Sequence, residues 1–197
     1  SGAAATLTIT RANQAFGGAI AGPVSLVIPA GGGSYQILSG NSTYTGVTTV
    51  YGALESWNTN ALGATGAGTV ITNGASLALK GNQEPMTFAA EPLSFFGSTT
   101  FSLNTDSTLR NVTWTGPITL ATGAVMTVAR GGVNAGTFTI QSPITGGGAI
   151  NKDSGTGVFA LILAGTNDYS GGTTLAAGTV KLGSHSGLGT GPVAVNA

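Results

Sequence analysis

The sequence predicts an all-β protein: a right-handed, single-stranded parallel β-helix (β-solenoid). Three observations lead to this prediction: short runs of alternating apolar and polar residues, glycines that bound these runs, and one unit that recurs far along the chain. Coils of roughly 20–25 residues would give about eight to ten rungs in a chain of this length. We expect residues 1–197 to form a single β-helix segment, part of a longer repeat protein.

The composition favours strands and tight turns. Hydrophobic residues make up 41% of the chain, which is enough for a continuous core, and charged residues make up only 6%, against a usual share of roughly 25%. The chain has 34 glycines and no cysteine. Glycine, threonine, serine and asparagine suit turns and the outward faces of strands. No window shows the apolar stripe of a long helix, so all-β is the expected class.

Alternation with period two is clearest at Thr6–Thr10, where Leu7 and Ile9 face the same way. Similar runs recur at 24–28, 76–79, 99–103, 118–120, 125–128, 137–140 and 158–163. Most of these runs are bounded by glycine, asparagine or proline. A β-sandwich or barrel would contain similar strands. A solenoid would add self-similarity at the period of its coil, so the repeat discriminates between these folds.

The repeat is carried by residues 38–50 and 163–175, which share the pattern L-x-G-x-x-x-Y-[ST]-G-x-T-T-[VL] at a constant offset of 125 residues. After one inserted residue the similarity continues, and residues 61–63 align with residues 187–189. We place the repeat units near 38–63 and 146–189.

Each position of the unit has an expected structural role. Tyr44 and Tyr169 would cover a corner, and Asn41 or Asn167 would cap turn amides. Glycines would stand at corners with a positive φ or a close approach of rungs: Gly40, Gly46, Gly52, Gly165, Gly171 and Gly178. Aliphatic residues would point inward: Leu38, Val50, Leu54, Leu163, Leu175 and Val180.

The segment 146–183 resembles the autotransporter-associated β-strand repeat, and the matching positions include Lys152, Gly155, Gly157, Gly165, Asn167, Tyr169, Gly171 and Gly178. The unit at 38–63 departs from that family's pattern at Ser42 and Val47. The resemblance implies a right-handed parallel β-helix from the passenger region of type V-secreted or other large surface proteins. It implies no particular activity, because such passengers carry many functions.

Charge and hydropathy narrow the classes of partner. The chain has six basic and six acidic residues, thinly spread, so we expect no nucleic-acid partner. No apolar stretch reaches the roughly 18 residues of a transmembrane helix, so no transmembrane segment is expected in this chain. The absence of cysteine excludes a disulfide framework and thiolate metal sites.

Chemically active groups are sparse. Carboxylate chemistry would need a cluster, and the six acidic residues form none along the sequence: Glu55, Glu84, Glu91, Asp106, Asp153 and Asp168. Glu84 and Asp106 have the separation at which neighbouring rungs could stack them, and Asp106 with Arg110 would equally form a surface ion pair. His185, the only histidine, lies in a turn-like stretch without partners for a triad or a metal. We therefore predict no catalytic, cofactor-binding or metal-binding residues, no cofactor and no enzymatic activity.

Four aromatic residues are either core residues or contacts for a glycan or protein ligand: Trp57, Trp114, Phe95 and Phe96. The least repetitive stretch, 82–98, contains two prolines, and we expect it to protrude from the rod as a loop.

The leading functional hypothesis is a structural or adhesive β-helical stalk or passenger segment of a secreted or cell-surface bacterial protein, located outside the cell or on its outer surface. A second hypothesis is a subunit of an extracellular filament that self-associates head to tail through open end rungs. A third is a polysaccharide-degrading β-helix enzyme. The segment 192–197 has the pattern of a strand stopped within a rung, which suggests either a piece of a longer repeat protein or a subunit whose next rung comes from a neighbour.

Overall fold

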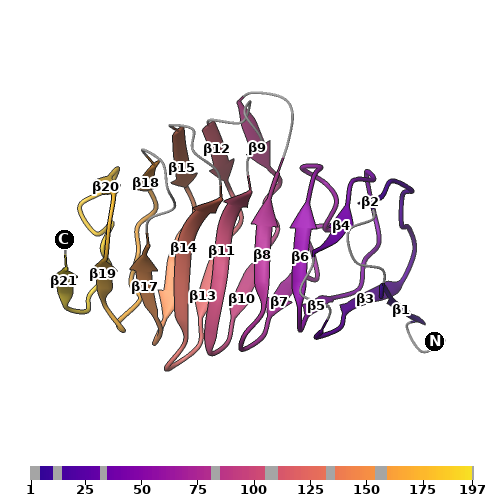
Figure 1. Ribbon diagram of the computed structural model, residues 1–197, viewed down its shortest axis with the longest axis horizontal. Coiled ribbons are helices and arrows are strands. Elements are labelled where there is room, and N and C mark those ends of the chain that lie inside the picture. Colours follow the sequence, from indigo (N-terminus) through magenta and orange to yellow (C-terminus); the bar gives the residue numbers. More distant parts are fainter. Residues whose placement is uncertain are drawn as a thin grey trace.

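The computed structural model describes residues 5–10, 15–31, 35–80, 85–104, 111–131, 136–153 and 159–196. These residues form an all-β parallel solenoid of about seven turns that contains no helix (Figure 1). The predicted fold class is confirmed. The strands at the two chain ends lie at opposite ends of the long axis (Figure 1).

Three parallel sheets run along the axis, and every strand pairs with strands of the neighbouring coils. Sheet A consists of β1 (Ala5–Thr8), β3 (Val24–Ile28), β5 (Thr48–Val50), β7 (Thr69–Ile71), β10 (Leu93–Phe95), β13 (Ile118–Leu120) and β16 (Ile144–Gly146). Sheet B consists of β2 (Ala15–Phe16), β4 (Gln36–Leu38), β6 (Ala53–Ser56), β8 (Ser76–Leu79), β11 (Ser98–Asn104), β14 (Val125–Gly131), β17 (Ala149–Lys152), β19 (Thr173–Leu175) and β21 (Val193–Val195). Sheet C consists of β9 (Met86–Phe88), β12 (Asn111–Trp114), β15 (Gly136–Ile140), β18 (Phe159–Leu163) and β20 (Thr179–Leu182).

The coils are less uniform than the sequence suggested. Gln36 pairs with Leu54, a step of 18 residues, whereas Ser98 pairs with Val125, a step of 27 residues. Long coils in the middle of the chain reduce the number of turns to about seven, below the expected eight to ten. The right hand of the winding stays a prediction, based on the steric preference of parallel crossover connections.

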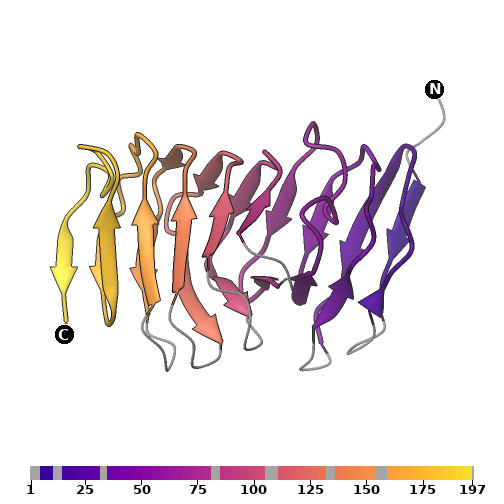
Figure 2. The ribbon, with the colours of Figure 1, turned by 90° about the horizontal axis from the view of Figure 1, so that it is seen from above.

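The number of strands per coil changes along the axis. In the first coils the chain alternates between sheets A and B, and the described residues of the third side form no strand. From β9 onward each coil adds a strand of sheet C, and after β18 the chain alternates between sheets B and C. Figure 1 shows sheet C rising beside the middle and C-terminal coils, and Figure 2 shows the coils stacked side by side along the axis.

Where all three sheets are present, aromatic rings fill the core. Trp114 stacks on Phe88 with their ring centroids 5.7 Å apart, and Phe101 meets the edge of Trp114 at 5.5 Å. Phe101 also contacts Phe138 at 5.0 Å and Phe95 at 5.7 Å. All five side chains are almost completely buried. Such edge-to-face and offset pairs add stabilisation beyond the burial of apolar area.

The two copies of the repeat occupy different sides of the solenoid. Leu38 ends β4 in sheet B, whereas the corresponding Leu163 ends β18 in sheet C. Val50 lies in sheet A, and its equivalent Leu175 lies in sheet B. Sheet B leads from β4 through five further strands to β17, and β18 is one side beyond that strand. The offset of 125 residues therefore corresponds to five coils plus one side.

Most of the predicted inward positions are confirmed. Four of them are completely or almost completely buried: Leu38, Val50, Leu54 and Leu163. Leu175 and Val180 are only half-buried. Among the described strands, β21 alone pairs with β19 on its outer side, and β20, which carries Val180, is the end strand of sheet C.

Each predicted corner glycine meets one of the two expected conditions, a positive φ or a close approach of rungs. Gly178 has a φ of 83°. A Cβ atom on any of the other five would come within 2.5 Å of backbone atoms of the preceding coil. The close approach of rungs therefore excludes any side chain at these five positions, as the sequence suggested.

Tyr44 and Tyr169 are fully buried, in agreement with a packing role. Each hydroxyl lies 2.5 Å from the Oγ1 atom of the threonine four residues later, Thr48 or Thr173. A glycine of the next coil packs on each tyrosine. Gly63 has a φ of 88°, and a Cβ there would lie 2.9 Å from the Tyr44 ring.

The turn-capping position of the unit is Asn167, not Asn41. Asn167 Oδ1 accepts a hydrogen bond from the Ile144 amide at 2.9 Å, and Nδ2 donates to the Gly187 carbonyl at 2.7 Å. Asn167 thereby connects three successive coils. Its equivalent in the first copy is Ser42, whose hydroxyl accepts only from the Ile20 amide, at 3.2 Å. Asn41 is exposed.

Replacing Asn167 with alanine should lower the free energy of unfolding by about 2 kcal/mol, because it leaves a buried amide and a buried carbonyl without partners. Urea denaturation followed by far-UV circular dichroism measures the loss. The control is Ser42→Ala, which removes one bond and should cost about half as much. Equal losses in the two variants would contradict the bridging role of Asn167.

The segment 82–98 does not protrude as a loop over its described part, 85–98. β9 pairs with β12 in sheet C, and β10 lies between β7 and β13 in sheet A. Leu93 and Phe95 are buried in the core. The loop was predicted because the segment lacks the repeat pattern. Backbone pairing between coils does not require a repeated sequence, so the segment can still form strands. Residues 82–84 lie outside the described residues.

Candidate functional site

One surface feature is the turn between each strand of sheet A and the next strand of sheet B, which we call the A–B corner. Tyr51, Thr72 and Phe96 occupy the same place in three successive coils, since their amides donate to Ile28, Val50 and Ile71 respectively. Each is followed at the corner by Gly52, Asn73 and Gly97 respectively. The A–B corner therefore places these three residues in a row along the axis.

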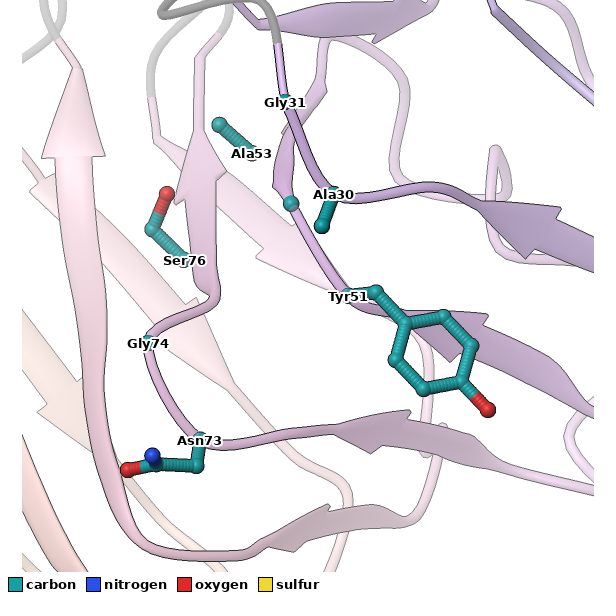
Figure 3. A pocket seen from close by; sticks show the side chains of 8 residues that line it. Ala30, Gly31, Tyr51, Ala53, Asn73, Gly74 and Ser76 are labelled. Atoms are coloured by element: carbon teal, nitrogen blue, oxygen red, sulfur yellow. The ribbon is translucent and has the colours of Figure 1, made fainter.

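A shallow groove follows this corner over three coils, at the turns after β3, β5 and β7. It has a volume of about 380 Å³ and is lined by Ala30, Gly31, Tyr51, Gly52, Ala53, Asn73, Gly74 and Ser76. Figure 3 shows the Tyr51 ring and the Asn73 side chain leaving the corner in opposite directions along it. The Tyr51 side chain is 50% exposed. No lining residue is charged, so the groove offers an aromatic ring, an amide and a hydroxyl to a neutral ligand.

The four aromatic residues singled out in the sequence divide into two classes. Trp114 and Phe95 are buried in the core, so they are packing residues. Phe96 is 47% exposed at the A–B corner, one coil beyond the groove. Tyr51 was missed at the sequence level. The signal that could have found it is its position directly before a corner glycine, in the same place as Phe96.

Trp57 lies elsewhere, just after the end of β6 in sheet B. Its Nε1 atom donates to Glu55 Oε2 at 2.5 Å, and Lys80 Nζ lies 4.4 Å from the ring centroid in a cation–π contact. The ring is partly exposed. Because Glu55 and Lys80 both engage it, we assign Trp57 to packing over the outer face of sheet B.

A row of buried polar groups lies where the strands β5, β7 and β10 of sheet A begin. Thr48 and Thr69 are paired neighbours on β5 and β7, and Thr69 Oγ1 donates to Glu91 Oε1 at 2.9 Å. Glu91 is only 4% exposed, and its Oε2 atom has no hydrogen-bond partner among the described residues. Burial raises the pKa of the Glu91 carboxyl to about 7, and the bond from Thr69 partly opposes that rise. Burial also raises the pKa of Tyr44, with a smaller contribution from Glu91.

The described carboxylates lie apart from one another. Glu55 belongs to sheet B, whereas Glu91 precedes β10 of sheet A. Asp153 and Asp168 are exposed. Glu84, Asp106 and Arg110 lie outside the described residues, so the stacking and ion pair considered for them stay predictions. His185 is exposed and lines a shallow depression near the C-terminal coil with Leu182, Gly183 and Ser184.

Lys152, a position of the family pattern, is completely buried. Its Nζ atom donates to the carbonyl oxygens of Asp153 and Ala177, and burial lowers its pKa while Asp153 opposes this. The lysine is thus a structural tie between neighbouring coils.

Over the residues that the structure describes, no three histidine, cysteine or acidic side chains gather where they could hold a metal ion. In the same residues, no helix is long and apolar enough to cross a membrane.

Comparisons with models of known protein families, with curated proteins and with solved structures found no match to the chain. The resemblance of the repeat unit to the autotransporter family is therefore not supported by a family match. The strand pairing in the structure identifies this chain as a parallel β-solenoid.

Proposed function

We propose that this chain is a structural and adhesive segment of a secreted or cell-surface bacterial protein, similar in role to the autotransporter passengers that its repeat resembles. The observation that carries the proposal is the uninterrupted stacking of coils, with sheet B passing through nine strands from β2 to β21. Each coil contacts its neighbours through parallel backbone pairing, which makes the solenoid a stiff spacer. The proposal assigns the segment no catalytic activity.

Two further features support an extended scaffold. The charged residues are few, so the surface consists mainly of uncharged polar groups and glycine turns. Tyr51 and Phe96 at the A–B corner are exposed to solvent and do not belong to the buried core. Exposed aromatic residues in a row are typical of contact surfaces.

Protease treatment of intact cells of the source organism, followed by immunoblotting with an antibody against the chain, tests its location. We expect the chain, or the protein that contains it, to be cleaved on intact cells or found in the medium. A chain that stays intact until the cells are lysed would overturn the surface location.

A further inference from the structure

We propose that the A–B corner binds a neutral, extended, β-linked polysaccharide that lies along the solenoid axis, with sugar rings on Tyr51 and Phe96. This inference rests on the proposed adhesive role and names its ligand class. It starts from the position of the two residues: their backbones occupy equivalent places two coils apart, on either side of Thr72.

The spacing of the two positions suits such a ligand. Neighbouring coils are separated by the strand spacing, so the backbones of Tyr51 and Phe96 lie on the order of 10 Å apart. In an extended β-linked glycan, alternate sugars present the same face at an interval of similar length. Two aromatic platforms at this interval can therefore each receive one sugar ring of a single chain, while the sugar between them passes over Thr72 and Asn73.

The polar groups between the rings have suitable chemistry. Thr72 Oγ1 is occupied, because it donates to the Val50 carbonyl at 2.9 Å. Asn73 Oδ1 accepts from the Ser98 amide at 2.8 Å, which fixes the orientation of the exposed side chain. The Asn73 Nδ2 group then points away from that bond and is available as a donor to a sugar oxygen. Ser76 adds a hydroxyl to the same groove.

The surroundings of the rings favour a neutral ligand in extended form. The groove has no charged lining residue, so nothing there would attract uronate or sulfate groups. Its floor is open, since Gly31 and Gly74 have no atom within 4 Å of an added Cβ. A flat glycan chain can approach a floor of this kind closely.

Isothermal titration calorimetry with cellohexaose and chitohexaose tests the inference, with the curved α-linked maltohexaose as a comparison. We expect one of the β-linked hexasaccharides to bind and maltohexaose to bind at least ten-fold more weakly. Tyr51→Ala and Phe96→Ala should each weaken binding about five- to ten-fold, since a stacked aromatic ring contributes roughly 1 kcal/mol. Asn73→Asp retains the acceptor for Ser98 and removes the donor, so it should also weaken binding several-fold.

Trp57→Ala is the matched control, because it removes a partly exposed aromatic ring away from the corner. It should leave the affinity unchanged. The inference is overturned if neither β-linked hexasaccharide binds, if binding survives in the Tyr51→Ala/Phe96→Ala double variant, or if Trp57→Ala abolishes it. Thermal unfolding confirms that each variant is folded. Because surface exposure is measured separately by proteolysis, a negative titration with a surface-exposed chain refutes the ligand class and leaves the structural role standing.

Discussion

Replacing Trp114 with alanine should lower the free energy of unfolding by about 4 kcal/mol, the largest loss expected from any single substitution in this chain. The Trp114 side chain is completely buried and contacts Phe88 and Phe101, so its removal opens a cavity between sheets B and C. The surrounding strands are fixed by pairing on both sides and cannot close that cavity. Urea denaturation followed by far-UV circular dichroism measures the loss.

Trp114→Phe is the informative control for this prediction. Phenylalanine keeps most of the ring contact and removes the indole Nε1 atom, which has no hydrogen-bond partner among the described residues. Because an unpaired buried donor is itself unfavourable, the phenylalanine variant should lose less than half as much stability. A Trp114→Phe variant as unstable as Trp114→Ala would show that the shape of the indole, not the filled volume, holds this part of the core.

The stability of the solenoid should fall as the pH rises from about 4.5 to 7, and Glu91 should be a main cause. Burial raises the pKa of its carboxyl from an ordinary value of 4.5 to about 7 in the folded chain. Within this interval the folded chain retains a proton that the unfolded chain has lost. The stabilisation is therefore complete below pH 4.5 and is lost as the pH approaches 7. Its total is about 3 kcal/mol.

Thermal melting of the wild type and of Glu91→Gln between pH 4 and pH 8 tests this expectation. Glutamine has nearly the same shape and no titrating proton, so the variant should match the wild type near pH 5 and exceed its melting temperature near pH 8. Tyr44, two coils before Glu91, is the described ionisable group that interacts with it; its own pKa is raised, so it stays neutral in this range. Parallel pH profiles for the two proteins would rule out Glu91 as the cause.

Much of the fold could be predicted from the sequence, because each coil of a solenoid is specified by short local patterns of apolar residues and glycines. The alternating runs specified strands, and the shared pattern around Tyr44 and Tyr169 specified coils with buried tyrosines and close glycine contacts. The position of β10 could not be predicted in the same way. Residues 93–95 carry no motif, and they form a strand only because β7 and β13 offer their edges on both sides.

The candidate site was harder to predict, because it depends on register between coils. Phe96 was recognised as a candidate contact, but its partner Tyr51 is 45 residues away and becomes its neighbour only when the coil lengths are known. Glu91 presents the same difficulty. Glu91 is buried beside Thr69 of the preceding coil, and nothing in the local sequence distinguishes it from an exposed turn residue.

The shift of the repeat by one side has a consequence for how the molecule meets its surroundings. Since the unit around Tyr44 faces a different way from the unit around Tyr169, the two copies cannot both contact one flat partner surface. Repetition in this chain therefore does not build a single sticky face, as it does in solenoids whose units stay in phase. It distributes equivalent turns around the circumference, so that a partner arriving from another direction meets a similar surface. Contacts confined to one line, such as the A–B corner, come from positions at which the two copies differ, such as Tyr51.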